Sequence, residues 1–207
     1  PTTTLPDAVE MAVSTFVSIA EQDKFRWVKY QRHEVPAVIA QCLNRWWEDL
    51  RPEILKEDVV ATEKEFEFLL DRIAPNIEVY GTGTIDVVTT TSLWDWKTAS
   101  RKYSEKEKQR EDIQSTMYAA AATSLGMLND WPVKFNFGVM VRDKGAHIVT
   151  VERTQSHVDW LRRLVKPLVR QALVIGTDTE WPMNDTGFLC NDTWCPFWSV
   201  CRGCHAQ

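Results

Sequence analysis

Residues 81–98, GTGTIDVVTTTSLWDWKT, decide the expected fold. The pattern predicts two extended segments, 79–90 and 92–98, separated only by a short threonine connection at 89–91. Strands joined so closely are expected to lie side by side in one sheet.

The sequence on either side of this stretch changes its hydrophobic period several times. Residues 59–70 alternate as a half-buried strand does, with Glu63, Glu65 and Glu67 on one side and phenylalanines on the other. Apolar residues at helical spacing mark the segments before and after the strands. The remaining predicted elements are helices at 7–31, 36–50, 106–125 and 154–175, the last perturbed at Pro167, and a hairpin of strands 133–141 and 146–151.

This order of elements predicts an α/β fold in which a mixed central β-sheet is flanked by helices. The chain has 207 residues, of which 44% are hydrophobic, so it is long enough to bury one sizeable core. We therefore expect a single domain over 1–207 with a mainly helical N-terminal part. Its expected parts are 1–58, helical; 59–152, the sheet and the helix that carry the site; 153–189, a C-terminal helix and linker; and 190–204, a cysteine cluster.

Charge and hydropathy limit the classes of partner. The net charge of -5 argues against a nucleic-acid partner, but the segments 101–110 and 153–170 are locally basic while 48–67 is acidic. Each basic segment is either a solvated helix face or a nucleic-acid contact. No run of about 18 apolar residues occurs, and the N-terminal residues lack a basic region followed by an apolar one. We therefore expect a cytoplasmic protein without membrane contact.

Two aspartates and a lysine are the candidate catalytic residues. Because side chains alternate along a strand, Asp95 and Lys97 are expected on one face, with Trp94 and Trp96 on the other. Pairing of the two strands would bring Asp86 within reach of Asp95. The result would be a carboxylate pair with an ammonium beside it.

This constellation suits metal-assisted hydrolysis of a phosphodiester. Carboxylate oxygens hold Mg²⁺ or Mn²⁺ and leave positions open for water and a substrate phosphate. The metal lowers the pKa of the attacking water, and Lys97 can orient that water or help to deprotonate it. Glu63 or Glu65 could add a further ligand. The alternative interpretation is an ordinary cross-strand ion pair in a small metal-stapled interaction module.

The helix predicted after these strands carries a second candidate group. Gln114 and Tyr118 are four residues apart and therefore lie on one helix face. Directed toward the acidic pair, their amide and hydroxyl could hold a nucleic-acid backbone or a base. The alternative is a buried tyrosine with a partnered glutamine.

Together these residues resemble a known family. The series Glu63…Gly83-x-Ile85-Asp86…Asp95-x-Lys97-Thr98…Gln114-x-x-x-Tyr118 is similar to the PD-(D/E)XK nuclease superfamily, in particular to RecB-type, CRISPR-adaptation and phage exonucleases. The resemblance implies a restriction-endonuclease-like core. It also implies that Asp86, Asp95 and the backbone carbonyl of Trp96 bind Mg²⁺ or Mn²⁺, that Lys97 is the catalytic lysine, and that Gln114 and Tyr118 form the family's helix motif.

The activity implied by this resemblance is a metal-dependent exonuclease acting on single-stranded DNA or duplex ends. Recombination, repair or CRISPR-associated proteins are the implied partners, and a phage-encoded chain would act in the host cytoplasm. One departure favours another interpretation, a catalytically weakened DNA-binding or assembly subunit. RecB-type nucleases usually carry a histidine metal ligand after a glycine on the second helix, whereas residues 36–47 contain neither and His33 lies a few residues upstream.

Four cysteines near the end of the sequence predict a metal site. In an intracellular protein, Cys190-x4-Cys195-x5-Cys201-x2-Cys204 indicates metal ligation rather than disulfides. This tail resembles that of iron–sulfur members of the family, in which a [4Fe–4S] cluster staples the chain ends together. Gln22 stands where such members have their first cysteine, so Cys204 or Cys42 would supply the fourth thiolate. Tetrahedral Zn²⁺ is the alternative metal, and a plain buried thiol is the alternative role of Cys42.

Overall fold

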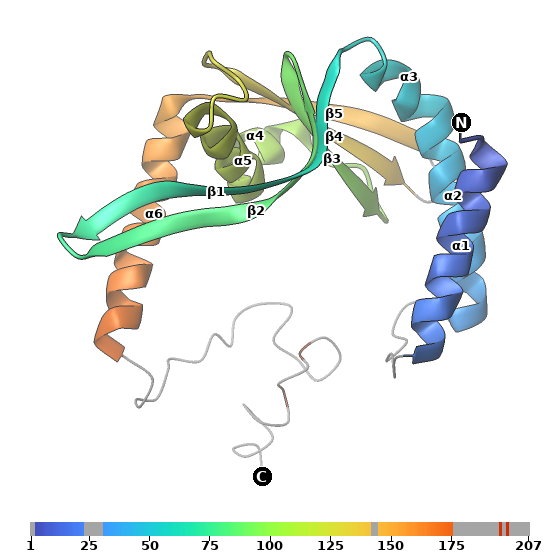
Figure 1. Cartoon of the computed structure of the whole chain (residues 1–207), viewed down its shortest axis with the longest axis horizontal. Coiled ribbons are helices and arrows are strands. Elements are labelled where there is room, and N and C mark those ends of the chain that lie inside the picture. Colours follow the sequence, from blue (N-terminus) through green and yellow to red (C-terminus); the bar gives the residue numbers. More distant parts are fainter. Residues whose placement is uncertain (1–2, 23–30, 142–144, 176–194, 196–197, 199–207) are drawn as a thin grey trace.

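The computed structural model describes residues 3–22, 31–141, 145–175, 195 and 198 (Figure 1). Within these residues, five strands form one sheet and helices pack on both of its faces. The helical elements are α1 (Leu5–Gln22), η1 (Arg32–Glu34), α2 (Val35–Arg45), η2 (Trp46–Leu50), α3 (Arg51–Ile54), α4 (Glu105–Glu111), α5 (Ile113–Ser124) and α6 (Gln155–Ile175). The strands are β1 (Val59–Ala74), β2 (Ile77–Thr89), β3 (Ser92–Ala99), β4 (Val133–Val141) and β5 (Gly145–Arg153).

The sheet is mixed, as the order of predicted elements requires. Its strand order is β1-β2-β3-β4-β5, with β3 and β4 parallel and the other neighbouring pairs antiparallel. A parallel pair needs a crossover connection, and α4 and α5 provide it between β3 and β4. The predicted α/β class with a mixed central sheet is therefore confirmed.

Helix α5 covers one face of the sheet and owes its close fit to small side chains. Its residues 119–122 are all alanine, and all four are buried in the main core. The long β1–β2 hairpin passes beneath this helix, where Gly81 leaves room for the ring of Phe68. A Cβ on Gly81 would lie 2.7 Å from that ring, so the absence of a side chain here lets the ring lie flat on the strand.

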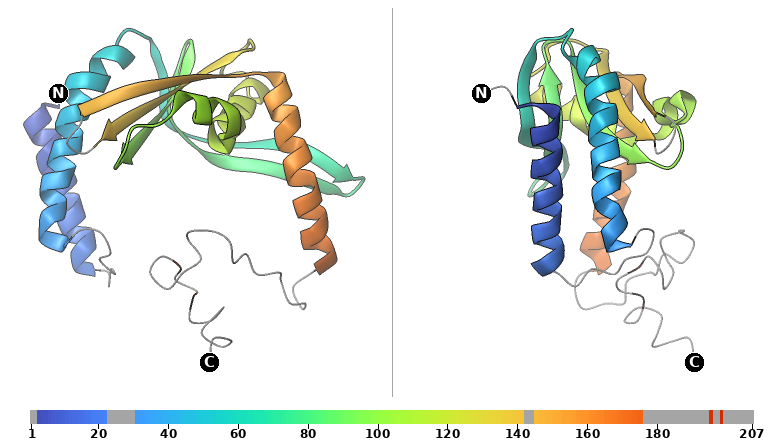
Figure 2. Two further views of the ribbon diagram at one scale, coloured as in Figure 1. Left: turned by 180° about the vertical axis from the view of Figure 1, so that it is seen from behind. Right: turned by 90° about the vertical axis from the view of Figure 1, so that its right-hand side faces the viewer.

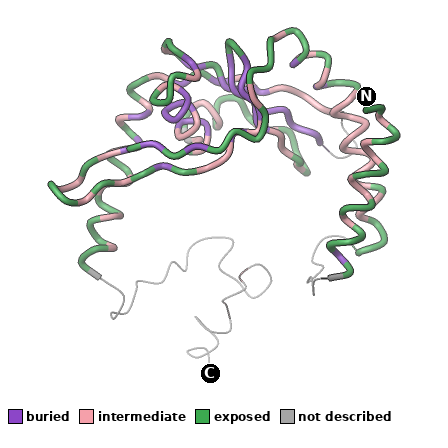
Figure 3. Tube along the Cα trace, viewed as in Figure 1, coloured by how far each residue is buried: buried purple, intermediate pink, exposed green. Residues whose placement is uncertain are grey.

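The N-terminal helices cover the opposite face. α2, η2 and α3 follow one another along this face, and α1 lies beside α2 (Figures 1 and 2). A second, smaller core of Ile54, Val87 and Trp94 lies there. Helix α6, which contains Pro167, packs against α5 and β1 at the other end of the sheet. Buried residues concentrate in the sheet and in α5, whereas α1 and the last turns of α6 are mostly exposed (Figure 3).

The boundaries of the predicted strands and helices differ from the observed ones in a few places. β1 continues to Ala74 and β2 begins at Ile77, so the hairpin that they form is longer than predicted. α1 ends at Gln22, and the rest of the helix predicted at 7–31 lies outside the described residues. In the described part of the chain, no helix combines the length and the apolar character needed to cross a membrane.

The single helix predicted at 106–125 is wrong, because the chain breaks it at Asp112. The backbone of Asp112 is extended, with φ -80° and ψ 107°, and its carboxylate accepts a hydrogen bond from the N–H of Ser115. An aspartate that bonds to nearby backbone groups competes with the helix and favours the start of a new one. Two helices, α4 and α5, therefore replace the one expected.

A buried arginine stabilises this break. Arg153 belongs to the basic segment for which the sequence predicts either a solvated helix face or a nucleic-acid contact. Both predictions are wrong for this residue, because it lies at the end of β5 and is 0% exposed. Its guanidinium donates to the backbone carbonyl oxygens of Lys108 and Gln109 and to Oγ of Ser115. The last carbonyl groups of a helix have no partner within the helix, and Arg153 supplies donors to those of α4.

Candidate active site

Asp95 and Lys97 form an ion pair on the face of β3 that α5 covers. Lys97 Nζ lies 2.6 Å from Asp95 Oδ2, and Asp95 is only 1% exposed. Trp94 and Trp96 point to the other face, where their ring centroids are 5.6 Å apart. Alternation along the strand thus places these four side chains on the faces that the sequence predicts.

Asp86 lies where β2 and β3 separate. The ladder between these strands ends at the pair Val87–Trp94, and the same register places Asp86 opposite Asp95. In place of a ladder hydrogen bond, the backbone N–H of Trp96 donates to Asp86 Oδ2 at 2.7 Å. This hydrogen bond holds the Asp86 carboxylate between the two strands, beside Asp95.

Glu63 is level with Asp86, but its side chain does not join the acidic pair. The register of β1 with β2 puts the backbone of Glu63 opposite Asp86. Glu63 has a left-handed φ of 47°, which is uncommon for a residue with a side chain, and it is exposed. Among the described residues, no three Asp, Glu, His or Cys side chains come together as a metal-binding group. The further carboxylate ligand that the sequence suggests is therefore not in contact with the other two.

The glutamine of the helix motif reaches Asp95 directly. Gln114 Nε2 donates to Asp95 Oδ1 at 3.0 Å and to the hydroxyl of Tyr118 at 3.0 Å. The Tyr118 ring is half-buried and packs edge-on against Phe66, with 5.5 Å between the centroids. Gln114 therefore orients a carboxylate of the site, and Tyr118 fits the interpretation of a packed tyrosine with a partnered glutamine.

Burial and neighbouring charges shift the pKa values of the ion pair. Burial is the largest influence on Asp95 and raises its pKa, and the carboxylates of Asp86 and Asp112 raise it further, against the lowering effect of Lys97. Burial is also the largest single influence on Lys97 and lowers its pKa, but Asp95 and Asp86 outweigh it, so the pKa of Lys97 is raised. Asp95 is thus costly to keep charged in the protein alone, whereas Lys97 stays a cation at neutral pH.

The buried carboxylate of Asp95 suits a metal ligand. The Lys97 ammonium lies 2.6 Å from Asp95 Oδ2, so this buried oxygen has a single cation beside it among the described residues and keeps a lone pair for a metal ion. Burial of a charged carboxylate costs free energy, which a bound cation would offset. Asp86, Asp95 and the carbonyl oxygen of Trp96 are the atoms that could hold Mg²⁺ or Mn²⁺ at this point.

Two neighbours of the site are not apparent from the motif series. Lys108 Nζ lies 2.6 Å from Asp112 Oδ2, a second ion pair whose only sequence signal is an i,i+4 spacing common on helix surfaces. Behind the site, Gly138 on β4 is the ladder partner of Trp96, and the indole lies across it. A glycine inside a strand is the signal for such a close approach.

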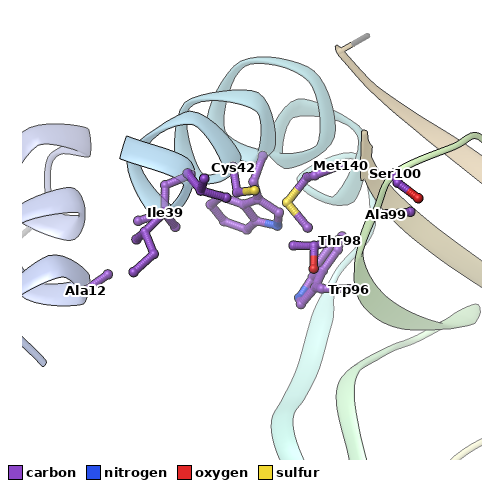
Figure 4. A pocket seen from close by; sticks show the side chains of 11 residues that line it. Ala12, Ile39, Cys42, Trp96, Thr98, Ala99, Ser100 and Met140 are labelled. Carbon is purple, nitrogen blue, oxygen red and sulfur yellow. The ribbon is translucent and has the colours of Figure 1, made fainter. Parts of the chain in front are cut away.

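The cysteines give no assembled metal site among the described residues. Cys190, Cys201 and Cys204 lie outside those residues, and Cys195 is half-buried and forms no disulfide with another described residue. Cys42 lines an apolar pocket of about 640 Å³ between α1, α2 and the back of the sheet (Figure 4). Burial raises the pKa of the Cys42 thiol, which favours a plain thiol over a thiolate ligand.

The mixed sheet with its flanking helices is the α/β fold of restriction-endonuclease-like proteins. The family model of the PD-(D/E)XK nuclease superfamily matches residues 3–202, and the chain belongs to this superfamily. Nucleases of the superfamily typically use Mg²⁺ or Mn²⁺. A search of curated proteins found no match to the sequence. The predicted superfamily is confirmed, and the RecB-type or CRISPR-adaptation-type subclass stays a prediction.

Proposed function

We propose that this protein is a metal-dependent DNA exonuclease of the RecB-type group, acting on single-stranded DNA or duplex ends. The observation that carries the proposal is the meeting of Asp86, Asp95 and Lys97 at the point where β2 and β3 separate. Membership of the superfamily supports nuclease chemistry. The preference for DNA ends rests on the likeness of the motif series to RecB-type and phage exonucleases.

Each side chain has a separate task in this proposal. Asp86, Asp95 and the carbonyl of Trp96 would hold Mg²⁺ or Mn²⁺, which when bound activates the attacking water and stabilises negative charge on the phosphate. The N–H of Trp96 keeps Asp86 beside the site, and Gln114 does the same for Asp95. Both carboxylates are thus oriented before the substrate binds. Glu63, which is level with Asp86 but exposed, would act through a water molecule.

Lys97 orients the attacking water and stabilises negative charge in this proposal. Burial lowers the pKa of Lys97, but Asp95 and Asp86 outweigh it, so in the protein without metal the ammonium keeps its protons at neutral pH. An ammonium donates hydrogen bonds, here to the attacking water or to a phosphate oxygen. Deprotonation of the attacking water, the other role that the sequence leaves open for Lys97, would need a pKa lowered toward neutrality.

Digestion of end-labelled linear and closed circular single-stranded DNA, with Mg²⁺, Mn²⁺ or EDTA, tests the activity. The wild type is compared with Lys97→Ala and with Lys134→Ala, which removes a strand lysine whose side chain is 48% exposed. We expect the wild type and Lys134→Ala to degrade linear DNA only with metal. Lys97→Ala should be slower by at least about a hundredfold, the lower end of the loss on removing one preorganised hydrogen-bond donor from a site of developing negative charge. Rapid cleavage of the circle would contradict an exonuclease.

A catalytically weakened DNA-binding or assembly subunit is the second candidate function. One observation favours it: in the described residues two carboxylates meet at the site without a third acidic or histidine side chain. The histidine that RecB-type nucleases usually carry on the second helix is also missing from residues 36–47. Metal-independent DNA binding without cleavage by the wild type, in either metal, would support this candidate over the exonuclease.

We further propose that Cys190, Cys195, Cys201 and Cys204 ligate a [4Fe–4S] cluster, with Zn²⁺ as the alternative metal. The spacing of the four cysteines and the resemblance to iron–sulfur nucleases support this proposal. Iron, sulfide and zinc are measured in protein purified without oxygen. Cys201→Ser should lose the metal, whereas Cys42→Ser should keep it, because the thiol of Cys42 lies in apolar surroundings. Loss of metal from Cys42→Ser alone would reverse this assignment.

A further inference from the structure

A second, polar pocket opens at the end of β3, beside the ion pair of Asp95 and Lys97. The loop 100–104 and α4 form it, and its volume is about 450 Å³. This volume falls within the range of roughly 300–1,000 Å³ typical of ligand sites. We call it the basic pocket, and the residues that matter for its chemistry are Arg101, Lys102, Tyr103, Glu107, Lys108 and Asp112.

Packed rings connect the basic pocket to the acidic site. Phe137 is the ladder neighbour of Asp95, and the ring of Tyr103 packs against it with 6.1 Å between the centroids. Lys108 Nζ lies 4.6 Å from the centroid of each of these two rings. The pocket therefore lies one layer of side chains away from the carboxylates, close enough for neighbouring groups of one polymer to occupy both places.

The charges of the basic pocket favour an anion. Arg101 and Lys102 are exposed, and neither forms an ion pair within the described part of the chain. Lys108 Nζ pairs with Asp112 Oδ2 at 2.6 Å, so these two residues line the pocket but contribute no net charge to it. Glu107 is the remaining carboxylate, and the two free cations outweigh it.

The loop that carries the free cations is tied down at its end. The backbone N–H of Tyr103 donates to Nε2 of His147 on β5 at 3.4 Å. The hydroxyl of Ser104 accepts from the N–H of Glu107 and caps α4. Because this backbone is already held, Arg101 and Lys102 lose less conformational entropy when they bind a ligand.

We infer that the basic pocket binds a phosphate of nucleic acid one nucleotide away from the phosphodiester held at Asp95 and Lys97. Arg101 pairs with the phosphate oxygens through its planar guanidinium, and Lys102 attracts them as a point charge. The inference rests on the proposed function, because that function places the neighbouring phosphodiester at the acidic site. The pocket makes the protein hold a strand and not a single nucleotide.

Fluorescence anisotropy with short fluorescein-labelled single-stranded oligonucleotides, in Ca²⁺, tests the inference. The wild type is compared with Arg101→Ala/Lys102→Ala, the pocket variant, and with Arg163→Ala/Arg170→Ala, which removes two exposed cations of α6. The Kd of the pocket variant should rise about tenfold, as for the loss of one charge-assisted hydrogen bond. Its slope of log Kd against log salt should fall by roughly 0.7, the value for one phosphate contact of a single strand. The α6 variant should change neither quantity.

Oligonucleotides with one uncharged methylphosphonate linkage locate the contact. In the wild type, a neutral linkage next to the cleaved bond should weaken binding more than one farther along the strand, and the pocket variant should show no further loss at that position. An unchanged Kd in the pocket variant would overturn the inference. So would an equal loss at every linkage or the same loss in the α6 variant, because either result means a diffuse attraction and no defined phosphate site.

The inference and the proposed function fail in different ways. If the wild type cleaves DNA but the pocket variant binds it as tightly, the phosphate site alone is refuted. If the neutral-linkage effect is present in the wild type and absent from the pocket variant, yet nothing is cleaved with metal, the phosphate site stands and hydrolysis is refuted. A wild type that binds no DNA refutes both.

Discussion

Replacing Gly138 by alanine tests how the back of the sheet supports the site. A Cβ at this position would lie 2.4 Å from Cζ3 of Trp96 and 3.2 Å from Cδ1 of Leu50. Carbon atoms pack at about 3.5–4.0 Å, so the indole would have to move by about 1 Å. It has little room to do so, because Trp46 and Trp94 lie against it at centroid distances of 5.7 and 5.6 Å.

Two consequences of Gly138→Ala are expected. Overpacking of this kind lowers the free energy of unfolding by about 1–3 kcal/mol, which urea denaturation measures. The displaced indole also shifts the backbone of Trp96, whose N–H holds Asp86 Oδ2 at 2.7 Å. Because outer contacts of metal ligands affect affinity by roughly 10–100-fold, Mn²⁺ affinity measured by calorimetry should fall by about tenfold or more.

A double variant separates the clash from every other effect of the alanine. Trp96→Leu removes the ring that the new Cβ would meet. In that background, Gly138→Ala should cost nothing, or should stabilise the protein by about 0.5–1 kcal/mol, since alanine loses less backbone entropy than glycine. An equal cost in both backgrounds would refute the reasoning, because the cost would then not arise from contact with the indole.

Three further predictions concern protons and buried charge. Burial above all raises the pKa of Asp95, and protons compete with Mn²⁺ for its carboxylate. The affinity for Mn²⁺ should therefore be constant above that pKa and should fall by up to about tenfold per pH unit below it. Calorimetry over a pH series checks this, and the fall should begin at a higher pH than for an exposed aspartate. Asp112→Asn keeps a capping side chain for α5 but removes a charge that raises the pKa of Asp95. The fall in Mn²⁺ affinity should therefore move to lower pH. An unchanged pH dependence of Mn²⁺ affinity would contradict this coupling. Arg153→Met leaves buried carbonyl oxygens of α4 without donors and should lower the free energy of unfolding by about 3 kcal/mol. In the same denaturation assay, the exposed control Arg163→Met should change it by less than about 0.5 kcal/mol.

The sequence by itself determined the main elements and the members of the acidic site. Alternation in residues 92–98 separates Asp95 and Lys97 from the tryptophans, and the spacing of four residues puts Gln114 and Tyr118 on one side of a helix. Both patterns follow from the regular geometry of one strand or one helix, in which residues a few positions apart share a face. Local chemistry of this kind was therefore open to prediction.

Only the tertiary structure decided how these elements meet. The parallel pairing of β3 with β4 sets Phe137 beside Asp95 and Gly138 behind Trp96, and no local pattern contains that register. Arg153, at the end of the edge strand β5, supplies hydrogen-bond donors to the end of α4, a role that its place in the locally basic segment 153–170 does not indicate. Register and burial arise from the packing of the whole core, so residues far apart in the chain settle them together.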